Sequence, residues 1–242
     1  TPALLTAIGR DAEGEELIGE AVRMGMICDY VYRSDDLPTD VYMAIEGANG
    51  LVAAIADAHS LEAAGEKILR ALGDGTLGSA ASPFAGLVAL DGNLTEELLQ
   101  TIATSPLFAA ADLRVAPASP GKAERLLALL GHPSATLYVN LEEAGLLCQT
   151  TFPDSATAAS ELITRGAHRV LVTDGGNSAS EGTAADIITQ IPPAVMVTRV
   201  TGAGDTFMAA HIASEAQGLD RDAALTRALN AAATYVSGET PL

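Results

Sequence analysis

The stretch that decides the fold is VTGAGDTFMAA, residues 200–210. An apolar run over residues 191–200, interrupted by two prolines, leads into it, and helix-forming residues follow it. This order predicts the end of a strand, a tight glycine turn and the start of a helix. Such a turn directs backbone N–H groups toward a ligand at the positive end of a helix dipole, and small residues allow a phosphate to approach closely. We therefore expect an anion-binding turn at Gly202, Ala203 and Gly204.

Asp205 follows this turn directly, although a carboxylate repels a phosphate. One interpretation is a general base, which takes a proton from a hydroxyl group while the turn holds the transferring phosphoryl group. The other is a residue that caps the helix or complements its dipole. The spacing alone leaves both open. The sequence contains no Gly-x-x-x-x-Gly-Lys-Ser/Thr pattern, which excludes a P-loop kinase.

Residues 201–207, TGAGDTF, resemble the second signature of the PfkB (ribokinase-like) family of sugar and nucleoside kinases, and the similarity extends along the chain. The overall pattern is most similar to the pseudouridine kinase branch. The resemblance implies a single kinase domain over residues 1–242, folded as a ribokinase-like three-layer α/β/α sandwich with a mostly parallel central sheet and a small β lid. It also implies ATP-dependent phosphorylation of a hydroxymethyl group, with pseudouridine converted to pseudouridine 5′-phosphate. Asp205 would be the base and the backbone of residues 202–205 the anion hole.

The cofactors that this resemblance implies are ATP and Mg²⁺, with a monovalent cation such as K⁺ as an open addition. Two other functions stay open: another ribokinase-like sugar kinase, and a nucleoside- or nucleotide-binding protein without catalysis. A dinucleotide-binding oxidoreductase is disfavoured, because no Gly-x-Gly-x-x-Gly follows a strand with an acidic residue further on.

Composition limits the partners of the chain. It has 242 residues, 48 % of them hydrophobic, which is enough for one large α/β domain with a sizeable core. Its formal net charge of −18 disfavours nucleic acids and anionic membranes as partners. The partner that the family resemblance implies is a small-molecule sugar or nucleoside. Cys28 and Cys148 show no metal-binding spacing, and no apolar run is long enough to span a membrane. A cytoplasmic protein with reduced cysteines is the expectation.

Strands alternate with helices along most of the sequence, which predicts right-handed crossovers and a mostly parallel sheet. The exception is a hairpin, in which residues 41–46 alternate with period two and 51–55 return after an Asn-Gly turn. The resemblance makes it part of a lid at about residues 27–56, through which family members often pair as homodimers. An ordinary hairpin at the sheet edge is the alternative. The family's opening strand and diglycine motif are not found in the sequence, so we expect an incomplete N-terminal part.

Ligands of open α/β sheets bind at the carboxyl ends of the strands, where this sequence places polar residues. Asp91 and Asn93 follow one predicted strand as substrate-side groups, and Asn93 equally suits the turn before the next helix. The resemblance gives Asn140 and Glu143 a role in ordering Mg²⁺ and phosphates, with Glu143 as the metal residue. Their spacing also matches a capping box, and both roles are compatible because the cap would orient Glu143.

The resemblance places the remaining cofactor-side residues as follows. Thr173, Gly175 and Gly176 would lie against the nucleotide phosphates and Asn230 near the adenine, with Thr201 on the same side. The alternative for Thr173, Gly175 and Gly176 is a plain turn, and the alternative for Asn230 is a polar residue on the surface. Pseudouridine-kinase-like chains tend to carry an aspartate where this chain has Ala116, which leaves the substrate open.

Further elements are expected as helices over residues 59–72, 123–130 and 206–217. The four histidines are scattered, and none has a carboxylate or serine at triad-like spacing, so no catalytic histidine is expected.

Overall fold

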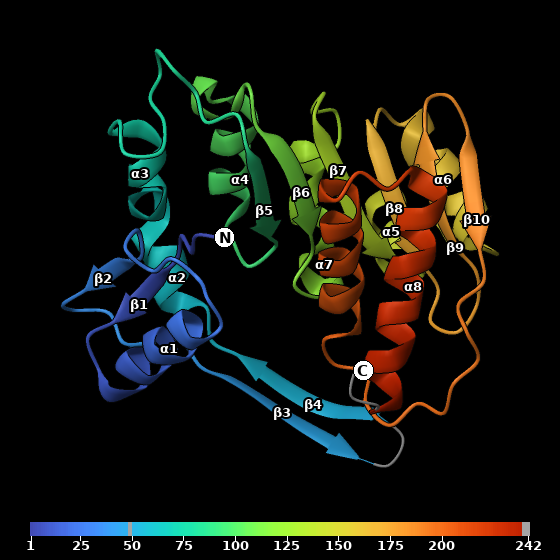
Figure 1. Ribbon diagram of the computed structural model, residues 1–242, viewed down its shortest axis with the longest axis horizontal. Helices are drawn as coiled ribbons and strands as arrows, with labels where there is room; N and C mark the ends of the chain where they lie inside the picture. The colour runs from blue at the N-terminus through green and yellow to red at the C-terminus, as the bar shows by residue number, and fades with distance from the viewer. Residues whose placement is uncertain (48–49, 239–242) are drawn as a thin grey trace. The chain divides into compact units, whose positions relative to one another are not determined.

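The computed structural model describes residues 1–47 and 50–238 (Figure 1). The chain divides into two compact units. The first comprises Thr1–Ile45, Ala53–Val88 and Asn93–Asp112, and the second comprises Glu46–Val52, Ala89–Gly92 and Leu113–Leu242.

The first unit opens with a βαβ segment. Strand β1 (Ala7–Gly9) pairs in parallel with β2 (Tyr32–Ser34), and helix α1 (Ala12–Arg23) connects them. The remaining helices of this unit are α2 (His59–Ala64), η1 (Gly65–Leu69), α3 (Arg70–Gly73), α4 (Glu96–Thr104) and η2 (Pro106–Phe108). The single helix predicted over residues 59–72 is wrong, because Gly65 takes a φ of +53° and interrupts it.

The predicted hairpin consists of β3 (Tyr42–Gly47) and β4 (Gly50–Ala56), which form a two-stranded sheet. Tyr42, Met43 and Ile45 are each more than half exposed, so an apolar surface remains on β3. The Ala48-Asn49 pair of the predicted turn lies outside the described residues.

The main sheet has the strand order β10-β9-β8-β7-β6-β5. Strands β6, β7 and β8 pair in parallel, whereas β9 and β10 are added as antiparallel strands at one edge. The strands are β5 (Leu87–Asp91), β6 (Asp112–Ala116), β7 (Ala135–Asn140), β8 (Arg169–Thr173), β9 (Ala179–Thr183) and β10 (Ile187–Gln190).

Helices cover both faces of this sheet in the second unit, which gives three layers (Figure 1). Helices α7 (Ala203–Ala216) and α8 (Arg221–Ser237) pack on one face, and α5 (Leu141–Cys148) and α6 (Ser155–Thr164) on the other. Strand β8 is buried on both sides, as expected for a parallel strand between two helical layers. The core under α7 and α8 includes Tyr138, Leu171, Phe207, Met208, Leu225 and Leu229.

The sequence did not reveal β9 and β10, and the strand predicted from the run over residues 191–200 is wrong. Strand β9 reads ASEGT and lacks the apolar pattern of a strand, although it is buried. Residues 191–200 form no strand, because two prolines remove hydrogen-bond donors. Their apolar side chains are largely exposed, with Met196 at 82 %.

The helix expected over residues 123–130 is a 3₁₀ helix, η3 (Pro120–Leu129). Its buried residues are Ala123, Leu126 and Leu129, which recur every three residues. This period matches the three residues per turn of a 3₁₀ helix and explains why a regular α-helix does not form.

Candidate active site

A small cavity of about 110 Å³ lies in the second unit, where the parallel strands end. Strand ends provide Pro117, Asn140 and Thr173, and α7 provides Gly204 and Asp205. Its volume is below the roughly 300 Å³ at which pockets that enclose a whole small-molecule ligand begin. The cavity therefore has the size of a reacting group. The other residues that line it are Ala116, Tyr138, Val139, Glu143 and Phe207.

The predicted anion-binding turn opens α7. Gly202 is the N-cap residue and has no side chain to satisfy the first N–H groups of the helix. The N–H of Ala203 donates to the carbonyl of Val200 at 3.1 Å. The N–H groups of Gly204 and Asp205 have no acceptor within the helix, because they belong to its first turn. These two groups are therefore the ones that the helix geometry leaves for a ligand.

Tyr235 of α8 holds this turn in place. Its hydroxyl donates to the carbonyl of Thr201 at 2.9 Å, and the guanidinium of Arg199 lies 3.8 Å from the centre of its ring. Gly202 has a φ of +88°, and a Cβ atom there would lie 2.6 Å from the Tyr235 hydroxyl oxygen. Only glycine fits this position, both for the backbone conformation and for the space.

We predict that Gly202→Ala lowers the free energy of unfolding by about 1–2 kcal/mol, because an L-residue is strained at positive φ. Urea denaturation measures this loss. Gly204→Ala is the matched control, since no atom beyond its chain neighbours and the backbone of its own helix lies within 4 Å of a Cβ placed there, and its φ is ordinary. Equal stability of the two variants would contradict the assignment of strain to Gly202.

Asn140 and Glu143 form the capping box that their spacing predicts. The Asn140 side chain accepts from the N–H of Glu143 at 2.9 Å, and Glu143 Oε2 accepts from the N–H of Asn140 at 2.8 Å. Glu143 is 7 % exposed, and this burial raises the pKa of its carboxyl group, against the lowering effect of its hydrogen bond from the Asn140 backbone. The cap directs a buried carboxylate into the wall of the cavity.

The comparisons with known proteins place this chain in a family. The model of the pfkB family carbohydrate kinases matches residues 1–240. The chain belongs to the pfkB family of carbohydrate kinases. Among curated proteins, none matches it.

Solved structures of kinases support the fold. A carbohydrate kinase from Agrobacterium tumefaciens is 27 % identical, with a TM-score of 0.77 over 96 % of this chain and 72 % of that one. A ribokinase from Thermotoga maritima has a TM-score of 0.77 at 20 % identity, covering 97 % and 74 % of the two chains. An adenosine kinase from Schistosoma mansoni, in complex with 2-fluoroadenosine, has a TM-score of 0.76 at 16 % identity, covering 98 % and 74 %. The expected ribokinase-like α/β fold is confirmed, and the pfkB family assignment makes the chain a phosphotransferase.

A pfkB kinase uses ATP and usually Mg²⁺, and the carboxylates of the cavity fit such an ion. Glu143 and Asp205 both line it, and carboxylate oxygens are the ligands that Mg²⁺ prefers. Within residues 1–47 and 50–238, no three acidic, histidine or cysteine side chains form a metal site by themselves. Mg²⁺ does not need one, because it commonly binds through one or two carboxylates together with substrate phosphates.

The other predicted site residues of this pfkB kinase lie outside the cavity lining. Gly175 has a φ of +55° in the turn between β8 and β9, where Asn177 N–H donates to the carbonyl of Asp174 at 2.8 Å. Gly176 shares this turn, and Asn230 is exposed on α8. Asp91 ends β5. Asn93 precedes Thr95, which caps α4.

Gly92 holds the end of β5 close to the cavity wall. Its N–H donates to the carbonyl of Ala116 at 2.8 Å, and a Cβ atom there would lie 2.7 Å from Pro117 Cα. Ala116 itself lines the cavity, at the position where the pseudouridine-kinase-like pattern has an aspartate.

Sequence reasoning missed two aromatic residues of the site and one buried histidine. Tyr138 and Phe207 line the cavity, but a buried strand and a helix core explain such residues equally well from sequence. His211, for which the sequence shows no partner at triad-like spacing, has a carboxylate neighbour in space, because its Nε2 lies 3.5 Å from Glu181 Oε2. Glu215, four residues after His211, was the available signal.

A second cavity, of about 330 Å³, lies in the first unit between Arg70, Asp74, Thr101 and Phe108. It contains none of the predicted site residues. Over the described part of the chain, no helix combines the length and the apolar character needed to cross a membrane.

Proposed function

We propose that this pfkB kinase transfers the γ-phosphoryl group of ATP to the 5′-hydroxyl of a nucleoside, with pseudouridine as the preferred acceptor. The observation that carries the proposal is the cavity in which Asp205 meets the N-terminus of α7. Asp205 takes the proton of the attacking hydroxyl, which makes its oxygen a better nucleophile. The N–H groups of Gly204 and Asp205 stabilise the charge on the transferring phosphoryl oxygens. The N–H groups of Gly202 and Ala203 complete the anion hole. The N–H of Ala203 does so by giving up its hydrogen bond to the carbonyl of Val200 and donating to the phosphoryl group instead.

Residues around this centre would hold the nucleotide. Thr173 lies beside Asn140 in the parallel pairing of β7 and β8, so both face the same edge of the sheet. We assign Thr173, Gly175 and Gly176 to the phosphates and Asn230 to the adenine side, with Thr201 supporting the turn. Asp91 and Asn93 are assigned to the acceptor.

Glu143 would hold Mg²⁺ directly or through water, and the ion would neutralise the charge that develops on the phosphates. Glu143→Gln tests this assignment. Glutamine retains the side-chain acceptor of the capping box, so the cap persists while the negative charge is lost. We expect the Mg²⁺ concentration for half-maximal activity to rise by about tenfold or more, which is the effect of losing roughly 1.4 kcal/mol of binding.

A Mg²⁺ titration of ADP release measures this shift. Glu142→Gln is the matched control, because Glu142 is the neighbouring carboxylate in the first turn of α5 and does not line the cavity. An unchanged Mg²⁺ dependence in Glu143→Gln would contradict the metal assignment.

The acceptor is identified by ADP release with Mg-ATP against pseudouridine, uridine, adenosine, ribose and fructose 6-phosphate. Preference for pseudouridine supports the proposal, and preference for another acceptor makes the chain a different ribokinase-like kinase. Binding of ATP and nucleoside without ADP formation would instead indicate a binding protein. Assays in KCl and in tetramethylammonium chloride test for activation by a monovalent cation.

We also propose that two copies pair through the β3–β4 hairpin. The exposed Tyr42, Met43 and Ile45 provide an apolar surface on β3 that a second copy would cover. Analytical ultracentrifugation of the protein and of its Met43→Lys variant tests this pairing, and an unchanged mass would contradict it.

A further inference from the structure

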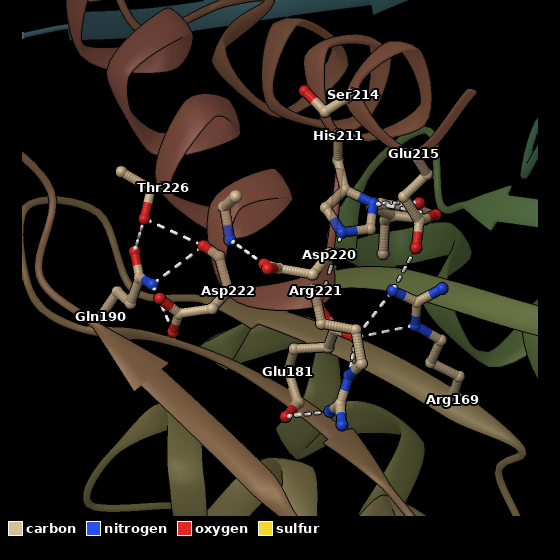
Figure 2. Close-up of polar contacts among 12 residues, drawn as sticks. Arg169, Glu181, Gln190, His211, Ser214, Glu215, Asp220, Arg221, Asp222 and Thr226 are labelled. Atoms are coloured by element: carbon tan, nitrogen blue, oxygen red, sulfur yellow. Dashed lines mark hydrogen bonds and ion pairs between the residues drawn. The ribbon is translucent and has the colours of Figure 1, made fainter. Parts of the chain in front are cut away.

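Charged and polar side chains form a buried to half-buried cluster between the main sheet and helices α7 and α8 (Figure 2). Glu181 and His211 are fully buried, with 0 % exposure each. The proposed reaction uses neither of them. The cluster draws on strands β6 to β9 and on both helices, and its members are Arg114, Tyr138, Arg169, Glu181, His211, Glu215 and Arg221.

Arginine–glutamate pairs connect β8 to β9 and both helices, α7 and α8, to the sheet. Arg169 donates to Glu181 Oε1 at 2.8 Å and to Glu215 Oε1 at 2.6 Å, and Arg221 donates to Glu181 Oε1 at 2.7 Å. Figure 2 shows His211 and Glu215 projecting from α7, with Arg169 reaching toward Glu215. Each pair is an oriented contact, because a charged hydrogen bond depends on direction as well as distance.

A chain of hydrogen bonds continues from this cluster to the cavity wall. Arg114 Nη1 donates to the Tyr138 hydroxyl oxygen at 3.1 Å, and that oxygen lies 2.9 Å from His211 Nδ1. Because the hydroxyl oxygen already accepts from Arg114, its own O–H is directed at Nδ1 as a hydrogen-bond donor. Burial raises the pKa of Tyr138 to about 12, which keeps this hydroxyl protonated. Nδ1 is then an acceptor, and this arrangement places the ring N–H on Nε2.

The contact of the other ring nitrogen, Nε2, fits this tautomer, while Glu215 Oε2 lies 3.7 Å from Nδ1, beyond hydrogen-bond distance. His211 Nε2 lies 3.5 Å from Glu181 Oε2, and both are buried side-chain atoms with no hydrogen-bond partner among the described residues. An N–H on Nε2 directed at a carboxylate oxygen is the favourable arrangement of these two atoms. His211 is therefore oriented from both sides of its ring, by Tyr138 and by Glu181.

The buried face of α7 is apolar near the start of the helix and polar in its second half. Phe207 and Met208 are buried near its start, whereas His211 and Ser214 are buried in its second half. Apolar contacts are not directional and tolerate sliding, but hydrogen bonds fix a helix along its axis. Asp205 precedes His211 by six residues, which is about 9 Å along the helix. Any axial shift at His211 is thus transmitted to Asp205.

We infer that Tyr138 and His211 are positioning residues that fix α7, and with it Asp205, relative to the carboxyl ends of the strands. The inference rests on the proposed function. Tyr138 links the two regions, because it lines the cavity and its hydroxyl bonds to His211. Misplacement of a reacting group by about 1 Å costs on the order of 10²-fold in rate.

The test compares Tyr138→Phe, His211→Leu and the double variant. We expect each single variant to lower kcat by about 10–100-fold with KM changed by less than about threefold. The double variant should lose no more than the worse single variant, because both remove the same interaction. His211→Asn, whose amide oxygen can accept at the Nδ1 position, should recover most of kcat.

Ser155→Ala is the matched control. It removes a buried hydroxyl hydrogen bond of 2.8 Å, between Ser155 of α6 and Ser180 of β9, and leaves α7 untouched. Unchanged kcat in Tyr138→Phe, additive losses in the double variant, or an equal loss in the control would overturn the inference. If His211→Leu fails to fold, the kcat of Tyr138→Phe alone tests the inference. An inactive wild type overturns the proposed function and this inference together, whereas an active wild type with an unaffected Tyr138→Phe overturns this inference only.

Discussion

Asp205→Asn is expected to lower kcat by about 10²–10⁴-fold, because the amide cannot take the proton of the attacking hydroxyl. The affinity for ATP should stay the same or rise slightly, since the negative charge of Asp205, which the variant removes, repels the phosphates. Asparagine retains the shape of the side chain, and Asp205 is exposed in the first turn of α7, so folding should be little affected. Steady-state ADP release gives kcat, and isothermal titration calorimetry gives the affinity for ATP.

Asp222→Asn is the matched control for this experiment. Asp222 is also an exposed carboxylate in the first turn of a helix, α8, and it does not line the cavity. Loss of the Asp222 charge should leave kcat near the wild-type value. An Asp205→Asn protein with more than about a tenth of wild-type activity would show that Asp205 is not the base and that its role is closer to that of a helix cap.

Glu181→Gln is expected to cause the largest loss of stability. Glu181 is fully buried, which raises its pKa, but contacts with His211, Arg169 and Arg221 outweigh this and lower the pKa to about 2 from 4.5. Each unit of pKa shift corresponds to about 1.4 kcal/mol, so the ionised group contributes about 3 kcal/mol to the free energy of unfolding. Neutral glutamine loses this contribution and leaves Arg169 and Arg221 less well paired.

The pH dependence of the free energy of unfolding follows from the lowered pKa of Glu181. The pKa of Glu181 is lower in the folded than in the unfolded chain, so its stabilisation is present above about pH 5 and is lost as the pH falls toward 2. The difference between wild type and Glu181→Gln should therefore be about 3 kcal/mol at pH 7 and should shrink steadily below pH 4.5.

Urea denaturation monitored by circular dichroism from pH 3 to pH 7 measures both effects. Glu161→Gln is the control, because Glu161 pairs with Arg165 on the surface of α6 at 2.8 Å. Exposed pairs of this kind contribute about 0.3–0.5 kcal/mol. Equal losses in the two variants at pH 7, or a difference that does not depend on pH, would contradict the stabilising role of Glu181.

The sequence predicted those parts of the fold that depend on local patterns. The glycine turn before Asp205 lies at the start of α7, and the Asn140–Glu143 spacing forms the capping box. Strand β8 follows from the buried run Val170, Leu171 and Val172. Each of these features is encoded within a few consecutive residues, so periodicity and turn chemistry suffice.

Features that depend on distant residues were not predictable in this way. Strand β9 has a polar sequence because Ser180 and Glu181 are buried through hydrogen bonds and ion pairs with residues elsewhere in the chain. The partners of Glu181 lie on β8, α7 and α8, and no spacing in the sequence connects them. Tyr138 likewise looks like an ordinary core residue in the sequence, and only the structure shows that it lines the cavity.

The central claim is that the cavity beside Asp205 transfers a phosphoryl group directly to a hydroxyl. The most direct test incubates the protein with Mg²⁺, pseudouridine and ATP whose γ-phosphate carries ¹⁸O at every oxygen, followed by mass spectrometry of the product. The account predicts pseudouridine 5′-phosphate with three labelled oxygens, because the bridging oxygen comes from the nucleoside. Labelled inorganic phosphate as the only product, with no phosphorylated acceptor, would contradict it.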